Sequence, residues 1–325
     1  MTHPRPAFVA GSPDLLPLAE SIASDWRRLG VRGHLLARNI DTGEQLGFDV
    51  ETPLPLASVA KVPIALAVLE RIATGSLDPA HRITVDPAAS SFGPTGISAY
   101  RHPVTLAVAD LVYQTLSVSD NAAADALVDL VGVDDIAESL REWGCGGIAF
   151  RHRLQRMYDC AAGVAGDDFG LALELATTSG STGRYAIETL DPEQGNVADA
   201  RALVDFLQQV WLDRISVPAA TAELRRLMAL QVFTFRLSAD LRTDTVRVAG
   251  KTGSFLHLRH EIGVVEARSG DRVAIAAMTR SARRANIAPD IDLAIGAAAR
   301  SAFEALRSTT GAQAVDPAAR RSCGG

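Results

Sequence analysis

The stretch "VRVAGKTGSF" (residues 246–255) contains Gly250-Lys251-Thr252, three residues that can also close a phosphate-binding P-loop. A P-loop needs a further glycine five residues before its Gly-Lys pair, so that backbone amides can surround the phosphates. Thr245 occupies that position, and residues 246–249 form an alternating, valine-rich run that is typical of a strand. The stretch therefore predicts a β-strand that carries Lys251, and this lysine needs an explanation other than phosphate binding.

Lysine is rare in this chain. Of the 32 basic residues, only Lys61 and Lys251 are lysines, and all the others are arginines. Arginine does not lose its proton in a protein, whereas a lysine removed from water can, and its compact ammonium fits where a guanidinium does not. Both lysines are therefore candidates for chemistry.

The overall composition is that of an ordinary globular protein, with 325 residues, 47% hydrophobic and 22% charged. A net charge of −6 gives no reason to expect nucleic acid or an anionic membrane as partner. The longest apolar run, residues 62–69, is too short to span a bilayer. No basic stretch followed by an apolar segment opens the chain, so no secretory signal is visible and we expect a cytoplasmic protein.

Cysteine and histidine give no sign of a metal site or a cofactor. Cys145, Cys160 and Cys323 are odd in number and form no C-x-x-C pair, which favours reduced thiols. The seven histidines show no metal-ligand spacing. His257 and His260 are three residues apart on a probable strand, which predicts opposite faces and structural or surface roles.

Periodicity along the chain predicts helices in the middle and strands near both ends. Residues 31–40 and 44–49 flank the turn "DTG" and predict a hairpin, and further strands are expected at 246–250, 260–267 and 272–279. The predicted helices include 14–29, 105–118, 121–131 and 290–307.

This order predicts an α+β fold, in which an antiparallel sheet flanked by terminal helices carries an inserted all-helical domain. The predicted limits are 1–54 plus 211–307 for the α/β domain and 55–210 for the helical domain. Residues 308–325 are expected to form a disordered tail.

Ser58 and Lys61 open a helix in "PLASVAKVPIALAVLERIATG" (residues 55–75). Residues three apart on a helix share a face, so the hydroxyl and the amine can meet. The apolar residues that follow indicate a buried helix, and burial lowers the pKa of a lysine until it can act as a base toward serine. A capping serine beside a snorkelling lysine explains the same pattern without chemistry.

Ser119-Asp120-Asn121 precedes the alanine-rich helix at 121–131. Taken alone, this tripeptide is explained by N-capping. It gains meaning because Ser58-x-x-Lys61, Ser119-Asp120-Asn121 and Lys251-Thr252-Gly253 follow one another along the chain.

These three motifs, in this order, resemble those of class A β-lactamases and penicillin-binding proteins. The similarity extends from about residue 14 to residue 307, and it implies the same fold. It also implies that Ser58 is the nucleophile, that Lys61 is its base or proton relay, and that Ser119 passes the proton to the leaving group.

The resemblance implies substrate-binding roles as well. Asn121 would hydrogen-bond the acyl side chain, while Lys251 and Thr252 would bind a substrate carboxylate, with Gly253 completing their motif. The backbone amides of Ser58 and Ser254 would form the oxyanion hole. Arg259 is a further candidate for the carboxylate, although its offset from Lys251 departs from the class A pattern, and a surface ion pair explains it equally well.

One element of the class A pattern is missing. Those enzymes carry an E-x-x-L-N motif whose glutamate activates the water that hydrolyses the acyl-enzyme. The corresponding region reads "AFRHRLQRMYDCAAG" (residues 149–163), where the nearest carboxylate, Asp159, is expected to be structural. Glu174, Glu188 and Glu193 lie further along, in a 150–196 segment that could shape the substrate site or be a surface excursion.

Three functions fit these observations. The first is a serine hydrolase or acyltransferase, such as an esterase or amidase of secondary metabolism, including antibiotic biosynthesis, that acts on a small molecule with a carboxylate. The second is a weak true β-lactamase or a D-Ala-D-Ala carboxypeptidase. The third is a non-catalytic penicillin-binding module.

Overall fold

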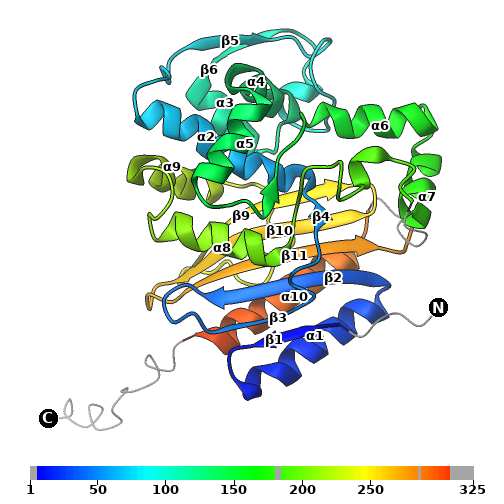
Figure 1. Cartoon of the computed structure of the whole chain (residues 1–325), viewed down its shortest axis with the longest axis vertical. Helices are drawn as coiled ribbons and strands as arrows, with labels where there is room; N and C mark the ends of the chain where they lie inside the picture. The colour runs from blue at the N-terminus through cyan, green and yellow to red at the C-terminus, as the bar shows by residue number, and fades with distance from the viewer. Residues whose placement is uncertain (1–5, 180–183, 285–286, 308–325) are drawn as a thin grey trace, which may run out of the picture.

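A six-stranded antiparallel sheet runs through the molecule (Figure 1). The computed structural model describes residues 6–179, 184–284 and 287–307. The strands lie in the spatial order β1-β3-β2-β11-β10-β9. Their bounds are β1 (Phe8–Ala10), β2 (Val31–Asn39), β3 (Gln45–Phe48), β9 (Val246–Phe255), β10 (Leu258–Ala267) and β11 (Arg272–Ser281). The two ends of the chain therefore meet where β2 pairs with β11.

Both faces of this sheet are buried, as the central strand β2 shows. Leu35 and Ala37 belong to the core beneath α1 (Leu16–Arg28) and α10 (Pro289–Leu306), whereas Leu36 belongs to the core on the opposite face. Successive side chains of a strand point to opposite faces, so one strand can serve two cores. Figure 1 shows α1 and α10 on one side of the sheet and the other helices on the far side.

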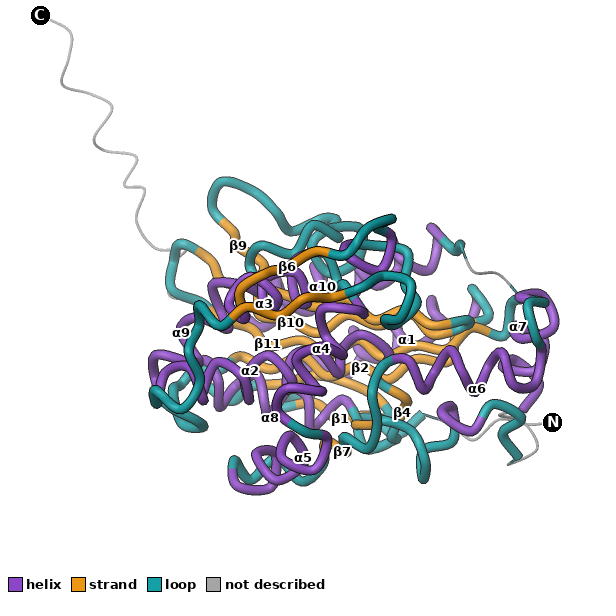
Figure 2. Tube along the Cα trace, turned by 90° about the horizontal axis from the view of Figure 1, so that it is seen from above, coloured by secondary structure: helices purple, strands orange, loops and turns teal. Residues whose placement is uncertain are grey.

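The layer on the far side of the sheet is mainly helical. Every residue of α2 from 61 to 69 is buried, and other helices of this layer pack against it. Figure 2 shows α6 and α7 together at one end of the molecule. Two small sheets accompany the helices of this layer. The bounds are α2 (Lys61–Ala73), α3 (Val108–Ser117), α4 (Asn121–Val131), α5 (Val133–Glu142), α6 (Gln155–Ala165), α7 (Phe169–Ser179), α8 (Ala200–Trp211), α9 (Pro218–Met228), β4 (Leu54–Pro55), β5 (Arg82–Val85), β6 (Val104–Ala107), β7 (Ile148–Ala149) and β8 (Val197–Ala198).

The α+β fold class and the antiparallel sheet are confirmed. The helix predicted at 105–118 begins three residues late, because residues 104–107 form β6 and pair with β5. The hydroxyls of Thr84 and Thr105 lie 2.7 Å apart across that pair. This cross-strand contact helps to hold residues 104–107 in a strand instead of the predicted helix. The edge strand β1 was not predicted, since its three residues are too few to show a period.

The domain limits at residues 54 and 211 stay a prediction. Helix α8 lies just before the second limit and packs against β2 and β11 of the central sheet. The expected tail, 308–325, lies outside the described residues. Among the helices of the described ranges, none has both the length and the apolar character that a membrane crossing requires.

The contact between β2 and α1 generates a stability prediction. A Cβ added at Gly33 would lie 1.9 Å from Cε3 of Trp26, so Gly33→Ala must displace the indole ring or the strand. Overpacking of this kind costs about 1–3 kcal/mol, and each kcal/mol lowers the unfolding midpoint by about 2–4 °C in a chain of this size. Thermal unfolding followed by circular dichroism measures the shift.

The matched control is Gly146→Ala, because a Cβ at Gly146 meets no atom within 4 Å. We expect this control to unfold close to the wild type. Equal midpoints for the Gly33→Ala and Gly146→Ala proteins would contradict the described packing of Trp26.

Candidate active site

Ser58 lies in the short 3-10 turn Ala57–Ala60, which leads directly into α2. Ala57 has a φ of 48°, in the left-handed region that residues other than glycine rarely adopt. Backbone strain of this kind gathers at functional sites. The alternative explanation of Ser58 as a helix cap is wrong, because no side chain makes a capping hydrogen bond to the turn or to α2.

The side chain of Lys61 is completely buried, and four oxygens surround its Nζ. Nζ lies 3.0 Å from Ser58 Oγ, 3.2 Å from Ser119 Oγ, 2.6 Å from the Ser119 carbonyl and 2.5 Å from Asn121 Oδ1. The carbonyl and the amide oxygen can only accept hydrogen bonds, so they take two N–H groups of the amine. When the amine is neutral, its lone pair is then free to accept a proton from a hydroxyl. The Ser58 hydroxyl is close enough to donate that proton.

Burial also favours the neutral amine. It lowers the pKa of Lys61 from its ordinary value to about 7, although the buried carboxylates of Asp120 and Asp125 act in the opposite direction. A lysine with this pKa is largely able to accept a proton near neutral pH. The snorkelling alternative for Lys61 is wrong, because the amine does not reach solvent.

Ser119 lies between the two lysines. Its Oγ is 3.2 Å from Lys61 Nζ and 2.9 Å from Lys251 Nζ, and its backbone has a φ of 60°. Lys251, in β9, is fully buried, and burial together with the charge of Lys61 lowers its pKa well below the ordinary value. Two ammonium groups on one hydroxyl repel each other, so this bridge favours a state in which one lysine is neutral and the other is charged.

The two explanations of Ser119-Asp120-Asn121 turn out to be compatible. The carboxylate of Asp120 accepts hydrogen bonds from the backbone N–H groups of Ala122 and Ala123 and thereby caps α4. The residues on either side of Asp120 both contact the Lys61 amine. Capping by the middle residue thus holds its two neighbours at the lysine.

Strand β9 approaches the Ser58 turn very closely at Gly253. A Cβ added there would lie 2.8 Å from the Leu56 carbonyl oxygen and 3.0 Å from Cγ2 of Val59. Only glycine allows a backbone approach of this kind. Gly253 therefore brings the strand that carries Lys251 against the turn that carries Ser58.

A buried polar chain satisfies the outer edge of β9. Gln231 Oε1 accepts the backbone N–H of Thr252 at 2.6 Å, and Gln231 Nε2 donates to Glu261 Oε1 at 2.8 Å. Glu261 Oε2 accepts the backbone N–H of Leu237, and burial raises the pKa of Glu261 to about 7. The edge strand is thus tied to the loop after α9.

The arginine next to the site is Arg236, which the sequence did not single out. Its Nη2 donates to Ser254 Oγ at 2.7 Å and its Nη1 to the Gly253 carbonyl at 3.0 Å. The predicted Arg259 is instead directed at the turn between β9 and β10, where its Nη1 donates to the carbonyls of Leu256 and Leu258. Arg259 does not line the described cavity at Ser58.

The cavity at Ser58 has a volume of about 320 Å³. Its lining contains five of the nine predicted site residues, together with aromatic residues that the sequence did not indicate. The lining residues are Ser58, Pro94, Thr95, Ser119, Asn121, Tyr158, Phe233, Phe235, Thr252 and Ser254. No carboxylate belongs to this described lining.

Tyr158 stands in the region where the E-x-x-L-N glutamate was sought. Asn121 Nδ2 donates to its hydroxyl at 3.2 Å, and its ring packs edge-on against Phe92 and Phe255. The neighbouring Asp159 is exposed and accepts a hydrogen bond from Gln155, on the surface of α6.

The other acidic residues considered from the sequence also lie away from the cavity. Glu174 pairs with Arg284, and Glu188 pairs with Arg156, both at the surface. Glu193 is exposed. The wall of the described cavity therefore contains the Tyr158 hydroxyl and no water-activating carboxylate, as the missing E-x-x-L-N motif predicted.

The fold and the bridge of two serines and two lysines are those expected of the β-lactamase-like serine hydrolase family. The chain belongs to the β-lactamase enzyme family, whose model matches residues 17–306. It is 38% identical over 292 residues to the β-lactamase regulatory protein BlaB of Streptomyces cacaoi, a match that covers 86% of this chain and 94% of BlaB.

Two solved structures support the fold. A β-lactamase from Sphaerobacter thermophilus has a TM-score of 0.72 and 20% identity, with 91% of this chain and 100% of that chain covered. PBP-A has a TM-score of 0.70 and 20% identity, with 90% and 96% covered. At this level of identity the likeness concerns the fold alone.

The scarcity of lysine allows a direct test of the lowered pKa. A protein labelled with ¹³C only in lysine has two side chains to observe, those of Lys61 and Lys251. We expect the Lys61 signal to titrate near pH 7, because burial penalises its charged form. Lys251→Met, which leaves one signal, assigns the spectrum. A Lys61 signal that titrates near its ordinary value of 10.5 would contradict the described burial.

Proposed function

We propose that this protein forms a covalent acyl-enzyme at Ser58 with β-lactam-like compounds that carry a carboxylate, and that it releases the acyl group slowly. The observation that carries the proposal is the buried Lys61 amine, 3.0 Å from Ser58 Oγ, at a described cavity whose wall contains no carboxylate. The first half of that observation supports acylation, and the second half supports slow release.

Acylation would proceed by proton transfer along the observed contacts. Ser58 Oγ gives its proton to the neutral Lys61 Nζ and attacks the carbonyl carbon of the substrate. When the carbon–nitrogen bond breaks, the nitrogen takes the Ser119 proton, and Ser119 recovers a proton from the lysine ammonium beside it. Ser119 is suited to this transfer because its Oγ contacts both amines.

Thr252 and Ser254 line one end of the cavity, and two basic groups lie behind that end. The buried Lys251 amine contacts Ser119 Oγ, and the Arg236 guanidinium donates to Ser254 Oγ, so this end would favour a substrate that carries a carboxylate. We propose Thr252 and Ser254 as the direct contacts of the carboxylate, with the Lys251 amine next to them behind Ser119 and with Arg236 holding Ser254 in place. Asn121 would contact the acyl side chain from the opposite wall, next to Tyr158.

Hydrolysis of the acyl-enzyme requires a base that activates water. Tyr158 is poorly suited, because burial raises the pKa of its hydroxyl and keeps it protonated at neutral pH. Loss of a general base typically slows a step by about 10²–10⁴-fold. A protein that is acylated readily and freed slowly records the presence of a β-lactam, which suits a regulatory role such as the name of BlaB describes.

A second candidate function is the hydrolysis of small esters, the esterase activity considered from the sequence. It is favoured by the cavity volume of about 320 Å³, since a short acyl group leaves room for water to approach from another side. Acyl transfer to another acceptor belongs to the same candidate, because it uses the same intermediate.

Turnover of a chromogenic cephalosporin and of p-nitrophenyl acetate, together with labelling by a fluorescent penicillin, separates these candidates. Penicillin labelling of Ser58 with little cephalosporin turnover supports the regulatory acyl-enzyme. Fast ester turnover without penicillin labelling supports the second candidate. Fast cephalosporin turnover indicates a true β-lactamase, and labelling that persists in Ser58→Ala protein contradicts Ser58 as the nucleophile.

Arginine should not replace either lysine. Lys61→Arg removes the proton acceptor, because a guanidinium stays charged, and we expect penicillin labelling to slow by about 10²–10⁴-fold. Lys251→Arg places a larger group against Ser119, and we expect at least about a tenfold loss, as for other hydrogen bonds with charged groups. Stopped labelling reactions analysed on gels give both rates.

The control is the reverse exchange, Arg300→Lys, at an exposed position paired with Glu304. It should label at the wild-type rate. If the two lysine variants fold and label as fast as this control, the lysines have no part in the acylation.

A carboxylate introduced at Tyr158 should restore release. Tyr158→Glu places an acidic group beside Asn121, and we expect it to shorten the lifetime of the penicillin adduct by about 10²-fold, the lower end of the effect of a general base. Tyr158→Gln, which has the same size without the charge, is the matched control. Equal lifetimes in the two variants, both checked for folding by circular dichroism, would show that the missing carboxylate does not limit release.

A further inference from the structure

The segment from Gln231 to Leu237, which we call the wall segment, follows α9 and forms part of the cavity at Ser58. All its residues are described, and none of them belongs to a helix or a strand. Phe233 and Phe235 line the cavity from this segment, and their ring centroids lie 6.0 Å apart. The shape of the wall segment therefore depends on individual contacts rather than on a ladder of backbone hydrogen bonds.

One carboxylate binds both ends of the wall segment. Glu261, a fully buried residue of β10, accepts a hydrogen bond from Gln231 Nε2 at 2.8 Å and another from the Leu237 backbone N–H at 2.8 Å. The Leu237 N–H belongs to the peptide group that follows Arg236, whose guanidinium donates to Ser254 Oγ. The contact at Leu237 therefore also fixes the backbone from which Arg236 reaches the cavity wall.

The order of donors and acceptors in this chain of contacts favours a carboxylate at position 261. The Thr252 backbone N–H can only donate, and it donates to Gln231 Oε1 at 2.6 Å, so Gln231 turns its NH₂ group toward Glu261. Glu261 then receives one hydrogen from Gln231 and one from Leu237, and an ionised carboxylate accepts both. An amide at 261 would have one oxygen for two donors. Turning the Gln231 amide around would only move the conflict to Thr252.

The surroundings of Glu261 accommodate a buried charge. Burial raises the pKa of Glu261 to about 7, whereas the charge of Arg236, the two hydrogen bonds and the charge of Lys251 act in the opposite direction. Gly250 leaves room for the carboxylate, because a Cβ there would lie 2.9 Å from Glu261 Oε1. Buried carboxylates with a perturbed pKa gather at functional sites, and this one lies directly behind the strand that carries Lys251.

We propose that Glu261 is a positioning residue of the acylation site, which holds the wall segment so that Phe233 and Phe235 face the bound compound. Glu261 does not belong to the described lining of the cavity, so it acts through these residues and not by touching the compound. This role rests on the proposed acylation. It adds that the wall segment determines how tightly a β-lactam is held before the covalent bond forms.

An exchange of two side chains tests the order of donors directly. Glu261→Gln leaves one donor without an acceptor. In the double variant, Gln231→Glu with Glu261→Gln, the carboxylate at 231 accepts the Thr252 N–H and one hydrogen of the amide at 261. The oxygen of that amide then accepts the Leu237 N–H. The order is restored, and one negative charge remains behind β9.

The rate of labelling by a fluorescent penicillin is measured over a series of concentrations at pH 8, where a carboxylate with a pKa of about 7 is mostly ionised. A wall segment that is held only part of the time reduces the population able to bind, which raises the half-saturating concentration and leaves the limiting rate nearly unchanged. We expect Glu261→Gln to raise the half-saturating concentration by at least about tenfold, as for a lost hydrogen bond to a charge. The double variant should recover most of this loss.

Hydrogen exchange of the Leu237 amide, followed in ¹⁵N-labelled protein, tests the same contact without acylation. Exchange should be faster in Glu261→Gln by at least about tenfold, because the amide loses its buried acceptor. In the double variant it should be slow again.

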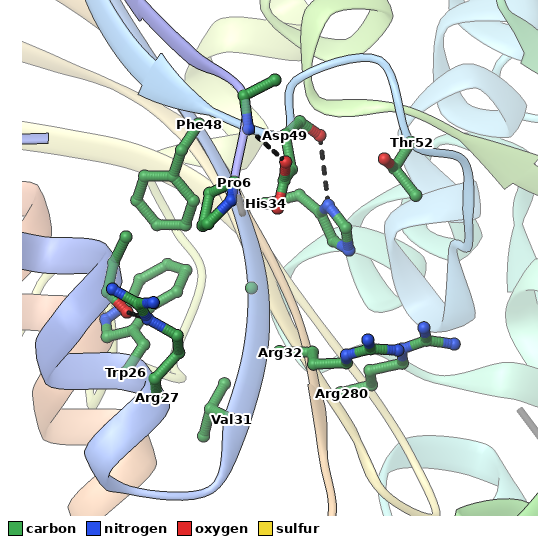
Figure 3. A pocket seen from close by; sticks show the side chains of 13 residues that line it. Pro6, Trp26, Arg27, Val31, Arg32, His34, Phe48, Asp49, Thr52 and Arg280 are labelled. Atoms are coloured by element: carbon green, nitrogen blue, oxygen red, sulfur yellow. Dashed lines mark hydrogen bonds between the residues drawn. The ribbon is translucent and has the colours of Figure 1, made fainter. Parts of the chain in front are cut away.

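The control is His34→Gln, at a buried residue of β2 (Figure 3). His34 lines a separate cavity, which shares no lining residue with the cavity at Ser58. Its Nδ1 lies 3.1 Å from the Asp49 carbonyl oxygen, so this variant loses a buried hydrogen bond elsewhere in the molecule. A general loss of folded protein lowers the amount that is labelled, and we expect both labelling constants of the control to match those of the wild type.

Three outcomes would overturn the role of Glu261. These are wild-type labelling constants in Glu261→Gln, a double variant that behaves like Glu261→Gln in labelling and in exchange, and a fall in the limiting rate alone. The last outcome would mean that Glu261 acts on the charge of Lys251 and not on the wall segment. Wild-type protein that is never labelled would instead contradict acylation at Ser58, and the exchange of Leu237 would still show whether Glu261 holds the wall segment.

Discussion

The amine of Lys61 is held in a place without water, between oxygens that can only accept hydrogen bonds and a hydroxyl that can donate one. Burial alone would expel the charge, and the two acceptors fix the direction of the remaining lone pair. The elements around the Lys61 amine keep it buried and hold these oxygens in place. Helix α2 is buried along its first nine residues, and β9 closes the site from the other side through the glycine contact at Gly253.

The same site contains the groups that we propose for acylation, and its described lining has aromatic side chains and no carboxylate that could serve hydrolysis. Tyr158 is held there by a hydrogen bond from Asn121 and by edge-on contacts with Phe92 and Phe255. These contacts fix the position of its side chain. Under the proposed function, such a site would form the acyl bond readily and release it slowly. A protein with that behaviour would respond to a compound rather than remove it.

The sequence predicted those parts of the site whose chemistry is local. Ser58 and Lys61 are one helical turn apart, and Lys251 stands out because it is the only lysine besides Lys61. Arg236 and Tyr158 could not be found in this way, because they reach the site from loops and helices far along the chain, and nothing in their local sequence marks them. Arg259 has the right residue type at nearly the right offset, but its guanidinium bonds the turn carbonyls instead of facing the cavity. The fold was more predictable than the site, since alternation and helical period extend over many residues. The prediction missed the short strands β1, β4, β5, β6, β7 and β8, which have four residues or fewer.

Intact-mass spectrometry after a short exposure to benzylpenicillin tests the central claim most directly. The wild-type protein, freed of excess drug and followed over time, should carry one penicillin and keep it long after the free drug is gone, while Ser58→Ala protein should carry none. A rapid return to the unmodified mass with release of hydrolysed penicillin, or an adduct of equal size on the Ser58→Ala protein, would contradict the account.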